Sequence, residues 1–266
     1  MTAREHHRHA LDTLPPTQWE AYLAAHSGLP GPRGNLELMA AVGDLAPAEQ
    51  LRAWSSADDE YLACCGTAGL GRLALQQDDT SPSPVTLLRA RASDERWRVR
   101  EAVAMALQRI GDGDPDLLVS VTRSWSDGSP YVLRAAVAGL CEPRLLRDPG
   151  LAGHTLHVLG LATEGLRNIE RTRRRDVDVR VLRQGLAYAW SVAVAARPAA
   201  GVPLLERWVD VEDPDVRWVL RQNLRKSRLQ RAAPDAVARM GAALGVDPRP
   251  RSRAQPTRSS AAAPTE

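Results

Sequence analysis

The apolar residues of this chain recur with the period of an amphipathic helix. In RWRVREAVAMALQRI, residues 96–110, they fall at offsets 0, 3, 4, 7, 8 and 11 from Val99. The segment VLRQGLAYAWSV, residues 181–192, shows the same spacing, and DVRWVLRQNLRKSRL, residues 215–229, keeps the start of it. Because an α-helix turns once every 3.6 residues, such positions form one stripe along its surface. The pattern predicts a helix with one buried face in each of these three segments.

Helices of this kind recur at a regular spacing, and polar turns precede three of them. The turns at residues 93–94, 127–130 and 212–215 carry Asp or Ser, whose side chains cap a helix start, and two of them carry Pro, which the first helical turn tolerates. Nine positions before the middle of a helix stand Trp54, Arg91, Trp125 and Trp208, at steps of 37, 34 and 83 residues. The long step has room for two units, and a fifth unit fits around residues 177–190, with Arg180 in the equivalent place. This periodicity predicts stacked helix–turn–helix units.

The two ends of the chain differ from this repeating pattern. Residues 1–10 are polar and are expected to be a disordered N-terminus, and residues 11–50, with a Gly/Pro loop at 27–35, are interpreted as an atypical helical capping unit. Residues 51–247 hold the repeats. The tail at 248–266 has the composition of a disordered basic segment. Its four arginines and one glutamate give 4 − 1 = +3, which equals the whole net charge, so residues 1–247 are neutral overall.

Composition supports an all-α fold. Hydrophobic residues make up 44% of the chain and Phe is absent, so the apolar residues are mainly Ala, Leu and Val. Ala and Leu favour helices. We therefore predict an all-α superhelix, a solenoid of about five helix pairs. The three cysteines form no disulfide framework, and no apolar run reaches the ~18 residues of a membrane span. We expect a cytoplasmic protein that does not insert into a membrane.

Two segments resemble HEAT repeats: SDERWRVREAVAMALQRIGDGD, residues 93–114, and DPDVRWVLRQNLRKSRL, residues 213–229. The resemblance extends over about residues 50–230. It implies a ladder in which an Asp near the turn pairs with an Arg of the second helix in the neighbouring unit. The positions that match this ladder are Asp94, Arg100, Arg134, Asp215 and Arg217.

One HEAT-like branch consists of DNA glycosylases that remove alkylated bases. Similarity to them would imply tryptophans that flank a carboxylate in a concave cleft. The candidate pairs are Trp54 with Asp58, Trp125 with Asp127, and Trp208 with Asp210. These tryptophans occupy the recurring repeat position, however, so we interpret them as packing residues and the catalytic pattern as unmatched.

A cluster of basic residues stands out in the last repeat. Residues 217–231 hold six basic side chains and no acidic one. On a single helix Arg217, Arg221, Arg225 and Arg228 would share one face, because they are spaced 4, 4 and 3 apart. Either this face is solvated or paired with acids of a neighbouring unit, or it binds an anion such as a nucleic-acid phosphate.

The leading functional hypothesis is a non-enzymatic scaffold that binds a protein partner on its concave face. The alternative is a DNA-binding or glycosylase-like protein that uses the four arginines. We predict no catalytic residues and no cofactor, because phosphate-loop, nucleophile-elbow and HExxH motifs are all missing from the sequence. His154 and His157 with Cys141 are too few for a metal site, so no metal ligand is assigned.

Overall fold

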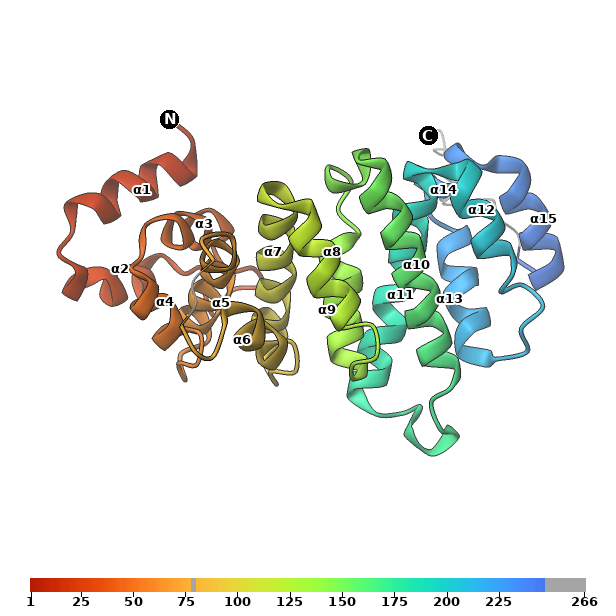
Figure 1. Cartoon of the computed structure of the whole chain (residues 1–266), viewed down its shortest axis with the longest axis horizontal. Coiled ribbons are helices and arrows are strands. Elements are labelled where there is room, and N and C mark those ends of the chain that lie inside the picture. The colour runs from red at the N-terminus through yellow and green to blue at the C-terminus, as the bar shows by residue number, and fades with distance from the viewer. Residues whose placement is uncertain (78–79, 247–266) are drawn as a thin grey trace, which may run out of the picture.

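The structure is a computed structural model that describes residues 1–77 and 80–246. Within these two segments all regular elements are helical, namely fifteen α-helices and three short 3-10 helices. The α-helices follow one another in chain order along the length of the molecule (Figure 1). This arrangement confirms the predicted all-α solenoid.

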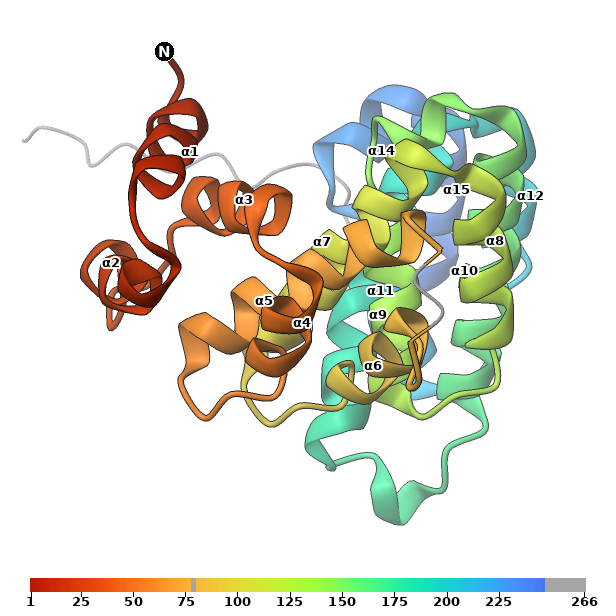
Figure 2. The ribbon, with the colours of Figure 1, turned by 60° about the vertical axis from the view of Figure 1, so that its left-hand side comes forward.

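Five consecutive helix pairs form the body of the molecule. They are α4 (Ala48–Trp54) with α5 (Glu60–Leu75), α6 (Pro84–Arg91) with α7 (Trp97–Gly113), α8 (Pro115–Ser124) with α9 (Pro130–Leu140), α10 (Pro149–Arg167) with α11 (Val177–Ala196), and α12 (Pro198–Glu206) with α13 (Pro214–Leu224). Each second helix packs against the second helix of the next pair. Figure 2 shows α7, α9 and α11 on one side of the body and α8, α10 and α12 on the other. The expected number of about five pairs is therefore correct.

The starts of these helices follow directly from the sequence. The side chains of Asp59, Asp114 and Asp213 each accept a hydrogen bond from a backbone N–H in the first turn of the helix that follows. A cap of this kind contributes about 1 kcal/mol, because it satisfies an amide that has no partner within the helix. Proline stands in the first turn of six of the ten body helices, α6, α8, α9, α10, α12 and α13, where its missing N–H costs nothing.

The core lies between the two layers of helices. All six positions of the predicted stripe from Val99 to Ile110 in α7 are at most 1% exposed. Trp54, Trp125 and Trp208 stand at the ends of the first helices α4, α8 and α12, and all three are buried. Their burial confirms that they are packing residues.

One very close helix contact depends on glycine. Gly66 in α5 lies against the last turn of α4, and a Cβ added at this position would lie 2.2 Å from the backbone nitrogen of Ser55. No side chain fits at that distance, so the packing of the first pair requires glycine here. In contrast, a Cβ added at Gly160 in α10 would have no neighbour within 4 Å.

The N-terminal part contains α1 (Ala3–Thr13), α2 (Trp19–His26) and α3 (Leu36–Leu45), with the 3-10 helix η1 (Pro16–Gln18) between the first two. The expectation of disorder over residues 1–10 is therefore wrong. Thr2 and Glu5 form a reciprocal capping box, and Leu11 is buried. The cap lies in a polar segment without a recognisable apolar stripe, which is why the pattern of apolar residues missed this helix.

A buried histidine connects the first three helices. The Nδ1 atom of His7 lies 2.9 Å from the hydroxyl of Tyr22, and its Nε2 atom lies 3.1 Å from the side-chain amide nitrogen of Asn35. Because Asn35 Nδ2 can only donate, His7 Nε2 must accept, and the ring is neutral. Burial, together with the charges of His6 and His26, lowers the pKa of His7, although Glu37 acts in the opposite direction.

The C-terminal end contains α14 (Ser227–Ala232) and α15 (Pro234–Leu244). Asn223, near the end of α13, is fully buried and bridges to α11. Its amide donates to the carbonyls of Leu186 and Val219 at 2.9 and 2.8 Å, and its oxygen accepts from the backbone N–H of Ser191 at 2.8 Å. The predicted disordered tail, residues 248–266, lies outside the described residues. No helix in the described parts of the chain is both long and apolar enough to cross a membrane.

Candidate functional site

The row of second helices carries two adjoining hollows. The first hollow, of about 510 Å³, lies between α3, α5 and α7 and is mainly apolar. Its lining residues are Arg33, Gly34, Leu36, Met39, Tyr61, Cys64, Trp97, Arg98, Glu101, Ala104, Met105 and Gln108. Leu36 is 55% exposed although its neighbour Met39 is buried. A large aliphatic side chain left open to water beside an apolar hollow is typical of a binding surface.

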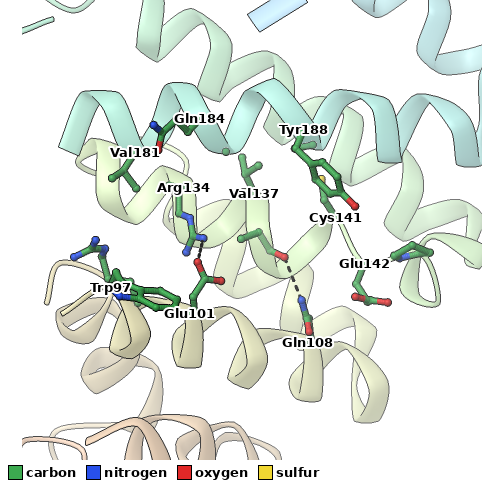
Figure 3. Close-up of a pocket in the computed structure, with 15 residues that line it drawn as sticks. Trp97, Glu101, Gln108, Arg134, Val137, Cys141, Glu142, Val181, Gln184 and Tyr188 are labelled. Atoms are coloured by element: carbon green, nitrogen blue, oxygen red, sulfur yellow. Dashed lines mark hydrogen bonds and ion pairs between the residues drawn. The ribbon is translucent and has the colours of Figure 1, made fainter. Parts of the chain in front are cut away.

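The second hollow, of about 520 Å³, continues along the same row between α7, α9 and α11. Figure 3 shows Trp97, Glu101 and Gln108 of α7 on one side and Val181, Gln184 and Tyr188 of α11 on the other. Arg134 and Val137 come from α9, which lies between these two helices. This hollow is more polar than the first, because an ion pair and two glutamine amides line it.

Trp97 stands where the two hollows meet and lines both of them. Its side chain is half exposed, and the guanidinium of Arg98 lies 4.6 Å from the centre of its ring. Trp97 begins α7 two positions before Val99, so it lies off the buried stripe of that helix. The sequence interpretation assigned no role to Trp97. Its position off the stripe was the signal that could have identified it.

Ion pairs link neighbouring second helices along this row. Arg98 of α7 pairs with Glu60 of α5 at 3.0 Å. Arg134 of α9 pairs with Glu101 of α7. Further along, Arg183 of α11 pairs with Asp215 of α13 at 2.6 Å. The partners lie 38, 33 and 32 residues apart in the sequence, which is close to one repeat.

The residues predicted to form the inter-repeat ladder take different parts in it. Arg134 and Asp215 belong to the pairs just described, with Glu101 and Arg183 as partners. Asp94 accepts from Arg96 of its own unit, and Arg96 in turn donates to the carbonyls of Ala57 and Asp58 in the preceding unit.

Arg100 pairs with no acid among the described residues. It donates to the backbone carbonyls of Asp94 and Glu95 and stacks on Tyr131 of the next unit, with 4.8 Å between the guanidinium carbon and the ring centre. Arg217 also lacks an ion pair within residues 1–77 and 80–246, although the sequence places it in the ladder. Both arginines occupy repeat-equivalent positions, but the acids that would complete the pattern lie elsewhere.

The four C-terminal arginines do not share one helix, which corrects the expectation from their spacing. Helix α13 ends at Leu224 and α14 begins at Ser227, so Arg225 lies at the break between them. Leu224 and Leu229 are both fully buried. On a continuous helix, residues five positions apart would point about 140° away from each other, so the chain breaks to bury both.

Each of these arginines has a different environment. Arg221 donates to the carbonyl of Leu244 at 3.2 Å, whereas Arg228 donates to the hydroxyl of Tyr188 and stacks on its ring. Arg225 is exposed, and Arg217 is half-buried. None of the four lines either hollow of the second-helix row.

Two further observations concern the cysteine thiols that line the hollows and the side chains that could bind a metal ion. Burial raises the pKa of the thiols of Cys64 and Cys141, which line the two hollows, to about 12, so both are protonated at neutral pH. Over the described residues, no three His, Cys, Asp or Glu side chains are grouped closely enough to hold a metal ion.

Residues 48–141 match the family of HEAT repeats. This part of the chain consists of HEAT-like repeats. The matched segment begins at the first residue of α4 and ends one residue after α9, so it spans three of the five helix pairs. Eight of the twelve residues that line the first hollow and eight of the fifteen that line the second lie within it. The two remaining helix pairs lie beyond the match. A comparison with curated protein sequences finds no relative.

Some solved structures are distantly similar to this chain. A designed armadillo repeat protein in complex with the peptide (KR)4 is 12% identical, with 86% of this chain and 100% of that chain covered and a TM-score of 0.35. A second designed armadillo repeat protein is 14% identical, with 78% and 98% covered and a TM-score of 0.30. An engineered protein is 12% identical, with 74% and 100% covered and a TM-score of 0.32.

Proposed function

We propose that this repeat protein is a non-enzymatic scaffold that binds an extended segment of a partner protein across the two hollows. The observation that carries this proposal is the half-exposed Trp97, which stands between an apolar hollow and a polar one. Tryptophan at the centre of a binding surface is a common energetic anchor. Because the hollows share this residue, one bound segment can contact both.

The first hollow is suited to an apolar anchor side chain of the partner. Met39 and Met105 line it together with Leu36, and methionine side chains adapt their shape to what they contact. Covering the exposed half of the Trp97 indole would remove about 100 Å² of apolar surface from water, which contributes about 2.5 kcal/mol to binding. This is roughly a 70-fold change in affinity.

The second hollow is suited to the backbone of the partner. Gln184 is exposed and, among the described residues, forms no hydrogen bond, so its amide is available. A glutamine amide both donates and accepts, and it therefore matches the peptide group of an extended chain. Across the hollow, Glu101 is held by Arg134 and keeps a defined position.

Selection from a random peptide library displayed on phage tests this proposal. The bait is the full chain, and the enriched peptides are then measured by fluorescence polarisation. We expect peptides with a large apolar or aromatic residue to be enriched. We also expect Trp97→Ala to weaken their binding by about tenfold or more.

Leu161→Ala is the matched control. Leu161 is 39% exposed on α10, a first helix, and lines neither hollow. Its substitution should leave peptide affinity unchanged. Equal losses for Leu161→Ala and Trp97→Ala, or no enriched peptide at all, would contradict the proposal.

Binding of nucleic acid through Arg217, Arg221, Arg225 and Arg228 is the second candidate function. One observation favours it: within residues 1–77 and 80–246 none of these arginines forms an ion pair. If they contact phosphates, binding to duplex DNA must weaken steeply as salt increases. Absence of binding at low salt refutes this candidate. If DNA binds, release of a base from alkylated DNA distinguishes a glycosylase-like activity from simple binding.

A further inference from the structure

A third hollow, of about 550 Å³, opens where the 3-10 helix η2 (Leu145–Arg147), the C-terminal end of α11 and helix α14 meet. The start of α10, which follows η2, lies at the same edge of the molecule as α14 (Figure 1). Apolar residues such as Leu146 and Val192 form part of the lining. The charged residues of the lining are all arginines: Arg147, Arg197, Arg228 and Arg231.

These four positive charges have no acidic counterpart in the hollow. None of the four arginines forms an ion pair with another described residue, and no Asp or Glu lines the hollow. The acids nearest to Arg147 in the sequence are engaged elsewhere, and Asp235, four residues after Arg231, does not line the hollow. Glu142 lies 3.1 Å from Arg144, and the carboxylate of Asp148 accepts from the first turn of α10. Like charges gathered in this way repel one another unless an anion lies between them.

Helix dipoles account for only part of this arrangement. Arg231 lies in the last turn of α14, where a cation is favoured. Arg197 stands between the end of α11 and the start of α12, so the two helix dipoles act on it in opposite directions. Arg228 lies in the first turn of α14, where a cation is disfavoured. Its position there therefore needs another explanation.

Arg228 is held in place by an aromatic ring of the neighbouring pair. Its guanidinium carbon lies 4.5 Å from the ring centre of Tyr188, and the same guanidinium donates to the Tyr188 hydroxyl. A guanidinium fixed in this way loses little freedom when it binds a ligand. The hollow therefore contains at least one positioned donor among its four cations.

We propose that this hollow binds a compact ligand that carries two or more phosphate groups. The planar guanidinium donates two parallel hydrogen bonds to phosphate oxygens, and four arginines exceed what a single phosphate requires. A volume of about 550 Å³ is in the range of small-molecule sites. The arginines converge from three elements onto one hollow, which suits a compact anion better than a long strand. This inference does not depend on the proposed function of the second-helix row.

Isothermal titration of the full chain with inorganic tripolyphosphate, pyrophosphate and phosphate tests the inference at low and high salt. We expect one tripolyphosphate per chain, bound more tightly than phosphate and more weakly as salt increases. The double variant Arg228→Gln/Arg231→Gln should lose about tenfold or more in affinity. Arg147→Gln/Arg197→Gln should do the same, and because both side chains are exposed this variant should fold normally. Arg225→Gln, which alters an exposed arginine outside the hollow, should change affinity little.

Three results would overturn the assignment. The first is absence of tripolyphosphate binding at low salt. The second is an equal loss of affinity in Arg225→Gln and in the two hollow variants, because this would show attraction by general charge only. The third is binding of a single-stranded oligonucleotide without binding of tripolyphosphate, because the arginines would then contact a strand and not a compact ligand.

Discussion

Substitution of Asp215 by alanine is expected to weaken the connection between the last two helix pairs. Asp215 is 6% exposed in the first turn of α13, and its two carboxylate oxygens accept from Arg183 at 2.6 Å and from Arg174 at 3.1 Å. Arg183 belongs to α11, and Arg174 belongs to the loop that precedes α11. In a solenoid each unit is stabilised mainly by its neighbours, so loss of this contact acts on the interface between two units.

The size of the effect follows from these contacts. Two charge-assisted hydrogen bonds contribute about 1.5–3 kcal/mol each, which sets an upper bound of about 6 kcal/mol. The side chains of Arg183 and Arg174 are 28% and 18% exposed, so water replaces part of the lost interaction, and Arg174 keeps its bond to Asp213 at 2.5 Å. We therefore expect Asp215→Ala to lower the free energy of unfolding by about 2–3 kcal/mol. In a chain of this length that corresponds to a decrease in Tm of roughly 4–12 °C.

Urea unfolding followed by circular dichroism measures this loss, and hydrogen exchange shows whether it is confined to α13 and its neighbours. Asp127→Ala is the control, because the Asp127 side chain is 91% exposed and its contact with Arg89 is 3.9 Å long. This control should cost less than about 0.5 kcal/mol. A double-mutant cycle with Arg183→Met separates the ion pair from the effect of Asp215 on the helix dipole. A loss below about 1 kcal/mol, or a cycle without coupling, would refute the reasoning.

Three further predictions concern packing, pH and buried hydrogen bonds. Gly66→Ala should destabilise the protein by about 3 kcal/mol or more, because a Cβ there would overlap the backbone of α4. Gly160→Ala should stabilise it slightly, because alanine has the higher helix propensity. Thermal unfolding compares the two variants. Because the pKa of His7 is lower in the folded than in the unfolded chain, the folded state binds fewer protons. The contribution of the neutral His7 to the free energy of unfolding is complete above about pH 6.5 and is lost as the pH falls below that value. The Tm should therefore decrease between pH 7.5 and 5.5, and His7→Gln should reduce this decrease; an unchanged pH dependence in the variant would contradict the role of the histidine. Asn223→Ala removes three buried hydrogen bonds and should cost about 2–3 kcal/mol in urea unfolding, whereas Gln222→Ala, which removes none that the structure describes, should cost under about 0.5 kcal/mol.

Local features of the sequence predicted the helices of the repeating pairs. The stripe that starts at Val99, the capping Asp213 and the proline that follows it all act within one helix or one turn, so each can be interpreted without knowledge of the fold. The burial of Trp125 followed from its recurrence at the repeat period. Helix α1 was missed because its capping box lies in a polar segment with no visible apolar stripe.

Tertiary structure decided which side chains meet between repeats and which remain open to water. The sequence placed Arg100 and Arg134 in equivalent positions, yet only Arg134 reaches an acid, whereas Arg100 donates to two backbone carbonyls of its own unit. The exposure of Trp97 depends on the space between three packed helices. The break after Leu224 arises because the core buries two leucines that a straight helix would hold on different faces. Periodicity along one chain therefore determined the helices and their buried sides, whereas the surfaces available to a ligand depend on distances between helices, which sequence spacing does not contain.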